Sequence, residues 1–185
     1  MNMFVLDRCP VKAAQMHCDK HVVKMCVEVM QMIGSALRRH GATDSMMPLT
    51  QKGTPMIGGY KHHPVTRWCG DSRANFEWAC KHGIALCEEY TYRYGKRHSA
   101  HDKILQMKDL ANVIPNGKLT SFAQAMPDEY KHDDAVVAYK RYYWYDKREN
   151  ISMTWKCNRK PRWFKEAEFF NQIGSFSDRI ANGFA

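Results

Sequence analysis

Residues 17–37 read HCDKHVVKMCVEVMQMIGSAL, and this stretch decides the fold class. At about 100° per residue of an α-helix, its apolar side chains fall on one face. This apolar stripe consists of Val22, Cys26, Val29, Ile33 and Leu37. Because a stripe of this period is typical of a helix that packs against a core, we expect one long helix over residues 10–39, ended by Gly41.

The same helix carries a polar strip on the side opposite the stripe. His17, His21, Lys24 and Glu28 recur along it at helical spacing. Apolar residues flank the strip, so the helix is expected to be central, with the strip facing a cavity, a partner or water. Two imidazoles, an ammonium and a carboxylate in one cavity form an acid–base site. The alternative is a solvated face with a helical salt bridge between Lys24 and Glu28.

Two further residues of the stretch bear on chemistry. Asp19 lies near the apolar arc, where a buried carboxylate needs a partner, and Lys20 lies near the polar strip. A lysine of this region can act as a nucleophile if neighbouring cations depress its pKa. The candidate catalytic residues are His17, Asp19, Lys20, His21, Lys24 and Glu89.

A metal site is an alternative use of the same imidazoles. His17 and His21 have the i, i+4 spacing of helical metal ligands, although the glutamate of the zinc-protease signature does not follow His17. A third ligand would come from His62, His63 or Cys69, with His63 preferred. The sequence requires no cofactor, but a divalent metal ion bound by these histidines is possible.

The rest of the chain predicts an all-α, compact multi-helix domain over residues 1–173, followed by a loose tail over 174–185. Residues 3–6 allow at most one short strand. Gly and Pro residues make 42–62 a long loop. Further helices are expected over residues 64–94, from Ser99 to 113, from Asp133 or Asp134 to 156, and over 163–173.

The composition favours a phosphate-bearing partner. The 185 residues carry a formal net charge of +9, with 44% hydrophobic and 25% charged residues. Such an excess of cations favours nucleic acid, DNA above all, or a nucleotide.

Seven cysteines without a paired framework predict a reducing compartment. No signal peptide and no apolar run of about 18 residues is recognised, so we expect a cytoplasmic protein that binds no membrane.

Basic and aromatic residues mark the expected nucleic-acid contacts. The junction 61–64 places cations and histidines at a helix start, where main-chain N–H groups bind anions, and the C-terminal third interleaves aromatic rings with cations. The candidates are Lys61, His62, His63, Arg73, Asn75, Trp78, Arg93, Lys96, Lys140, Arg141, Arg159, Lys160 and Arg162. The alternatives are that His63 merely caps its helix and that Trp78 belongs to the core. Asp128 and Glu129 are loop carboxylates that can act as a general base or hold a lysine.

These motifs together resemble a family of small proteins encoded by tailed phages and some bacteria. The resemblance rests on HCDKHVVK at 17–24, HP at 63–64, EEYTYRYGK at 88–96, MPDEY at 126–130 and PRWF at 161–164. It spans nearly the whole chain. A phage origin implies work on DNA in the host cytoplasm, such as repair, base modification or evasion of host defence.

Three functions follow from these observations. The first is an enzyme on DNA, a glycosylase or a base-modifying transferase, that flips its target base into a pocket. The second is a metal-dependent nuclease or phosphohydrolase. The third is a non-enzymatic binder of DNA or of a host protein.

Overall fold

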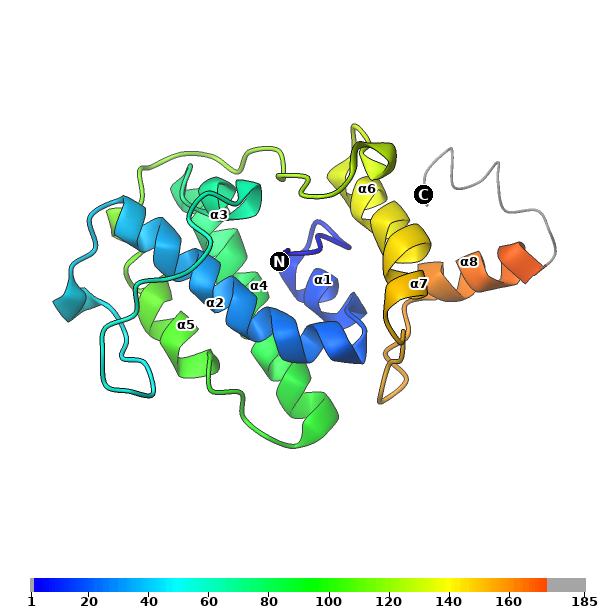
Figure 1. Ribbon diagram of the computed structural model, residues 1–185, viewed down its shortest axis with the longest axis horizontal. Helices are drawn as coiled ribbons and strands as arrows, with labels where there is room; N and C mark the ends of the chain where they lie inside the picture. The colour runs from blue at the N-terminus through cyan, green and yellow to red at the C-terminus, as the bar shows by residue number, and fades with distance from the viewer. Residues whose placement is uncertain (1, 173–185) are drawn as a thin grey trace.

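The stretch with the apolar stripe forms α2 (Asp19–Arg39) in the computed structural model, which describes residues 2–172. α4 (Arg73–Tyr94) packs along α2, and α1 (Pro10–Met16), α3 (Pro64–Cys69) and α5 (His101–Lys108) pack around this pair (Figure 1). All five side chains of the stripe are fully buried. The expected all-α class is therefore confirmed, and residues 2–172 form one compact domain.

The long helix expected over residues 10–39 is wrong in one respect, because the chain breaks between α1 and α2. His17 and Cys18 have extended backbone conformations. Their surroundings replace the missing helical bonds: the Cys18 N–H donates to the Tyr143 hydroxyl, and the Asp19 N–H donates to the Thr154 carbonyl. The break is thus stabilised by residues more than a hundred positions away, which no local pattern contains.

The helix expected over residues 64–94 is also divided. α3 ends at Cys69, and α4 begins after Ser72, whose side chain accepts a hydrogen bond from the Asn75 N–H as an N-cap. Gly95 ends α4 with φ 65°, a left-handed conformation that favours glycine.

The C-terminal third begins with α6 (Ala135–Tyr142), which continues as a π-helical turn, η4 (Tyr143–Lys147), and as α7 (Arg148–Asn150). The helix expected to reach residue 156 therefore ends early. α8 (Arg162–Gln172) follows, and the expected loose tail at 174–185 lies outside the described residues. Short 3-10 helices complete the structure at Asp44–Met46, Ala111–Val113 and Asp128–Tyr130.

The N-terminal segment lies between the two parts of the molecule. Residues 3–6 are buried, but they form no strand, since the Leu6 N–H turns back to the Phe4 carbonyl, and among residues 2–172 the only bridge joins Leu49 and Pro55. α1 and the N-terminal segment separate α2 and α4 from α6 and α7 (Figure 1). None of the described helices has the length and apolar character that a membrane span requires.

Candidate active site

A buried carboxylate on α2 meets the N-terminal segment. The Asn2 backbone N–H donates to Glu28 Oε2 at 3.1 Å, and Lys24 Nζ lies 3.3 Å from Glu28 Oε1. The Asn2 side chain is fixed in turn, because its Nδ2 donates to the Ala125 carbonyl at 2.7 Å and its Oδ1 accepts from the Tyr139 hydroxyl at 3.0 Å. Glu28 is therefore held by an anchored segment on one side and by a mostly exposed lysine on the other.

His21 lies one turn before Lys24 on α2 and faces the same segment. Its ring stacks on Phe4 with centroids 4.5 Å apart, and its Nδ1 lies 2.6 Å from the Tyr143 hydroxyl. The π-helical turn places Tyr143 at this position. We call the group Asn2, His21, Lys24, Glu28 and Tyr143 the Glu28 cluster.

Burial keeps the His21 imidazole neutral. Burial, followed by the nearby ammonium groups of Lys147 and Lys24, lowers the pKa of His21 to about 3. A neutral imidazole bonded to a tyrosine hydroxyl can relay a proton, because it accepts one proton on one ring nitrogen as it releases the proton on the other. The cluster therefore combines a carboxylate, an ammonium and one neutral imidazole, whereas the second imidazole expected on the polar strip, that of His17, lies outside it.

His17 and His82 form a second pair of buried imidazoles with ring centroids 5.4 Å apart. Each Nδ1 donates to a backbone carbonyl, of Ala13 and Pro10 respectively. Burial lowers the pKa of His82 to about 4 and that of His17 well below its usual value. Each Nε2 is buried without a hydrogen-bond partner among the described residues, so protonation of either ring would bury an unpaired charge.

We therefore expect the protein to lose stability as the pH falls below about 6.5, the ordinary pKa of histidine. The folded pKa values lie below the unfolded one, so the unfolded chain binds more protons in this range. The contribution of the two neutral histidines to the free energy of unfolding is complete above pH 6.5 and is lost as the pH falls toward 4. Each histidine that is charged only in the unfolded chain lowers this free energy by about 1.4 kcal/mol per pH unit. Urea unfolding between pH 7 and pH 5 measures this slope.

His82→Asn keeps a donor for the Pro10 carbonyl and removes the titrating ring. The slope of its unfolding free energy against pH should be smaller than that of the wild type by about 1.4 kcal/mol per pH unit, because one proton fewer is taken up on unfolding. His62→Asn, at an exposed histidine, is the matched control and should leave the slope unchanged. An equal slope in His82→Asn and the wild type would contradict the assignment.

Asp19 and Glu89 belong to a different cluster, centred on Arg93 of α4. The guanidinium donates to Glu89 Oε1 at 2.7 Å and to Asp19 Oδ1 at 3.0 Å. It also donates to the carbonyls of His17 and Gln15, at the break between α1 and α2. All three charged side chains are buried. We call this group the Arg93 cluster. Its buried, mutually paired charges indicate a structural role, in which they fix the break between α1 and α2 against α4.

The structure therefore brings His21 and Lys24 together and separates them from Asp19 and Glu89. His17 lies between the two clusters, since its carbonyl accepts from Arg93 and its ring lies 6.2 Å from that of His21. The Lys20 side chain is exposed.

Three expected nucleic-acid contacts are buried. Asn75 donates to the Trp68 carbonyl and to Thr120 Oγ1. The Trp78 ring stacks on His82, and its Nε1 donates to the Arg8 carbonyl. With Arg93 in its cluster, none of these three side chains is available to a base.

The remaining expected contacts lie nearer the surface, in different environments. His63 accepts from the Val65 N–H and caps α3, while Arg73 and Arg141 are partly buried and Lys96 is exposed.

In the C-terminal third, most of the expected cations are paired. Arg159 pairs with Glu89, Lys160 with Glu168 and Arg162 with Glu166, and Lys140 lies over the Trp163 ring. Asp128 pairs with Lys131, and Glu129 is exposed beside it. Lys61 and His62 line a cavity.

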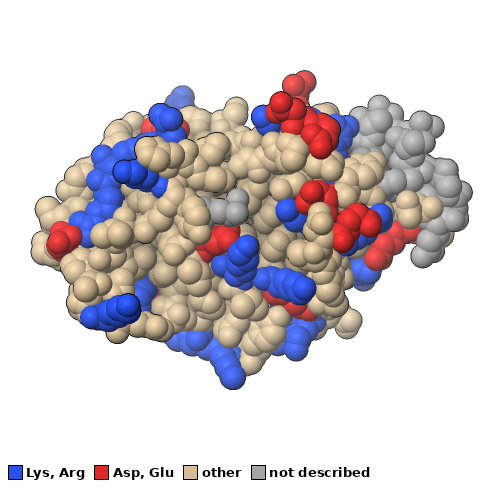
Figure 2. Space-filling view, viewed as in Figure 1, with Lys and Arg blue, Asp and Glu red and all other residues tan. Residues whose placement is uncertain are grey.

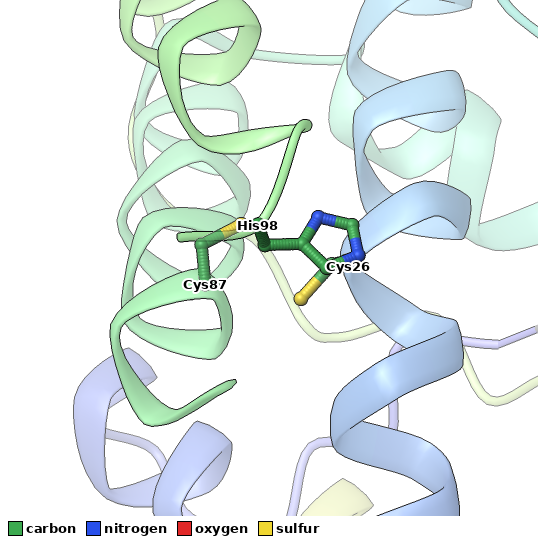
Figure 3. Close-up of side chains that lie close together, drawn as sticks. All are labelled: Cys26, Cys87 and His98. Carbon is green, nitrogen blue, oxygen red and sulfur yellow. The ribbon is translucent and has the colours of Figure 1, made fainter. Parts of the chain in front are cut away.

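The expected metal set of His17, His21 and His63 does not form a ligand group within residues 2–172. The one group of three possible ligand atoms found there is Cys26, Cys87 and His98, all within 4.8 Å of one another (Figure 3). His98 Nδ1 accepts from the Ala100 N–H, so the proton of the neutral ring resides on Nε2. Hydrogen bonds with Cys26 and His98 lower the pKa of the Cys87 thiol. These three residues form a thiol–imidazole network in the core. Hydrogen bonds among them explain why their side chains lie close together.

Sequence reasoning did not select Asn2, Glu28 or Tyr143 as site residues. Glu28 lies on the polar strip as the carboxylate of the expected acid–base site, with a salt bridge to Lys24 as the alternative, but it is not among the candidate catalytic residues. Asn2 and Tyr143 gave no local signal, because their partners lie 26 and 122 positions away in the sequence.

Comparison with known proteins bears on the first half of the chain. A family model described as pyrimidine dimer DNA glycosylase matches residues 1–102, which is more than half of the sequence. The match spans α1 to α4, and so includes Lys24, Glu28 and the whole Arg93 cluster. No curated protein and no solved structure matches the chain.

Proposed function

Because the chain belongs to the pyrimidine dimer DNA glycosylase family, we propose that it cleaves the N-glycosidic bond of a dimerised pyrimidine in DNA at the Glu28 cluster. The family membership makes the protein a DNA glycosylase-like enzyme with DNA as its substrate. The choice of lesion and of site residues is our proposal.

The observation that carries the choice of site is the contrast between three carboxylates. Asp19, Glu28 and Glu89 are the buried acidic residues among those described. Arg93 holds two of them inside the protein. Glu28 contacts Lys24 instead, whose side chain is 66% exposed. A substrate can therefore approach Glu28 by displacing a flexible side chain, whereas access to the other two would require the core to open.

The chemistry of base release needs such a carboxylate. As the bond between C1′ and the base nitrogen breaks, its electron pair leaves with the base and positive charge develops on the sugar ring. A fixed negative charge beside C1′ stabilises this state, as carboxylates do in glycoside hydrolysis. The attacking group is an amine of the cluster or a water molecule, and in both cases Glu28 accepts the proton that the nucleophile loses.

A duplex with one thymine dimer tests the proposal directly. We expect the purified protein to release the dimer's 5′ or 3′ base from its sugar, while undamaged duplex and uracil-containing duplex of the same sequence remain intact. Borohydride distinguishes the nucleophile, because an amine passes through an imine to C1′ that is reduced to a stable protein–DNA adduct, whereas water gives no adduct. Lys24→Gln then tests whether Lys24 is that amine. Failure to cleave the dimer-containing duplex would overturn the proposed lesion.

A further inference from the structure

A basic cavity lies at the other end of α2 from the Glu28 cluster. Its volume is about 450 Å³, and it lies between the C-terminal half of α2, α3 and the loop before α3. Its lining includes Arg38, Arg39, Lys61, His62, Thr66 and Arg67. Lysine and arginine side chains gather on this part of the surface (Figure 2).

The charges of this lining are only partly balanced. Arg38 pairs with Asp44 at 2.6 Å, and Arg39 pairs with Asp71 at 2.9 Å. Lys61 and Arg67 are exposed and form no ion pair with any residue in 2–172. Two cations therefore remain without a counter-charge beside a concave surface, which concentrates a positive potential there.

A buried hydroxyl gives a second, independent indication of a ligand. Thr66 is 2% exposed, and its Oγ1 has no hydrogen-bond partner within the described chain. Most buried polar groups in proteins are hydrogen-bonded, so an orphan hydroxyl in a cavity wall calls for a partner. An anionic oxygen in the cavity would accept from Thr66 and be neutralised by Lys61 and Arg67.

We propose that this cavity binds a phosphate group of the DNA backbone at a distance from the reacting sugar. Ten residues of α2 separate Glu28 from Arg38, which corresponds to about 15 Å along the helix. The bound phosphate therefore belongs to a nucleotide several positions from the lesion or to the opposite strand. The inference rests on the proposed function for its ligand, but its test does not depend on base release.

The decisive variant is Lys61→Gln with Arg67→Gln, measured by fluorescence anisotropy on an undamaged duplex between 50 and 200 mM salt. Loss of one phosphate contact should reduce the slope of log affinity against log salt by about 0.9. Lys81→Gln with Lys108→Gln is the matched control, since it removes the same charge from exposed positions outside the cavity. The control should leave the slope unchanged.

Thr66→Val tests the cavity itself, because it removes the hydroxyl without changing charge or shape. We expect several-fold weaker DNA binding with an unchanged salt slope. Equal slopes in the double variant and the control would overturn the proposal, as would full DNA affinity in Thr66→Val.

Inorganic phosphate separates the two sources of this ligand chemistry. If it raises the melting temperature of the wild type but not of the double variant, while the DNA slope is the same in both, the cavity serves a small phosphate compound and the DNA assignment is overturned. A protein without glycosylase activity would still show the change in slope, so failure of the proposed function and failure of this inference are distinguishable.

Discussion

Glu28→Gln is expected to reduce the rate of base release by about 10²–10⁴-fold, the usual contribution of a positioned acid–base group. The amide keeps an oxygen that accepts the Asn2 N–H, so the N-terminal segment retains its anchor. What is lost is the negative charge beside the reacting sugar. The measurement is the single-turnover rate on a dimer-containing duplex at saturating protein, which excludes effects on binding.

Glu88→Gln is the matched control, because Glu88 is an exposed glutamate on α4 outside both clusters. It should leave the rate unchanged. The DNA affinity of Glu28→Gln should stay within a few-fold of the wild type, since the variant removes no cation. A rate loss below tenfold in Glu28→Gln would contradict the assignment of this carboxylate to the chemistry.

The fold class could be predicted from the stripe on α2, because a period of 3.6 residues reflects one packing face. The boundaries could not. The break at His17 and Cys18 exists because Tyr143 and Thr154 accept the backbone N–H groups of Cys18 and Asp19. A helix end that is stabilised by tertiary hydrogen bonds leaves no glycine, proline or capping residue in the local sequence.

Part of the site could be predicted in the same way. The helical period placed His21, Lys24 and Glu28 on one strip, and the structure brings them together. The sequence offers Asp19 and Glu89 as candidate catalytic acids, and only the fold reveals that Arg93 lies between them. Pairing across 74 positions is invisible to a reading of periodicity, as is the contact of Glu28 with Asn2.

Removal of the guanidinium in Arg93→Met is expected to destabilise the protein by about 3–5 kcal/mol, the usual cost of breaking a buried ion pair by deleting one partner. The Arg93 side chain is fully buried, and methionine fills much of its volume without charge or donors. Asp19 and Glu89 would then remain buried without the guanidinium, and the Gln15 and His17 carbonyls at the break would lose their donor. Urea unfolding at pH 7 measures the loss.

The chain offers a close control for this variant. Arg162 forms an i, i+4 ion pair with Glu166, as Arg93 does with Glu89, but its side chain is 93% exposed. Arg162→Met should leave stability unchanged within error, because exposed ion pairs contribute little. Adding Asp19→Asn and Glu89→Gln to Arg93→Met should restore part of the loss, since the cost arises from a buried Asp19 left without its guanidinium and a buried Glu89 left with Arg159 alone. Equal stabilities of Arg93→Met and Arg162→Met would show that Asp19 and Glu89 do not depend on Arg93, and both would then return as candidates for the reaction.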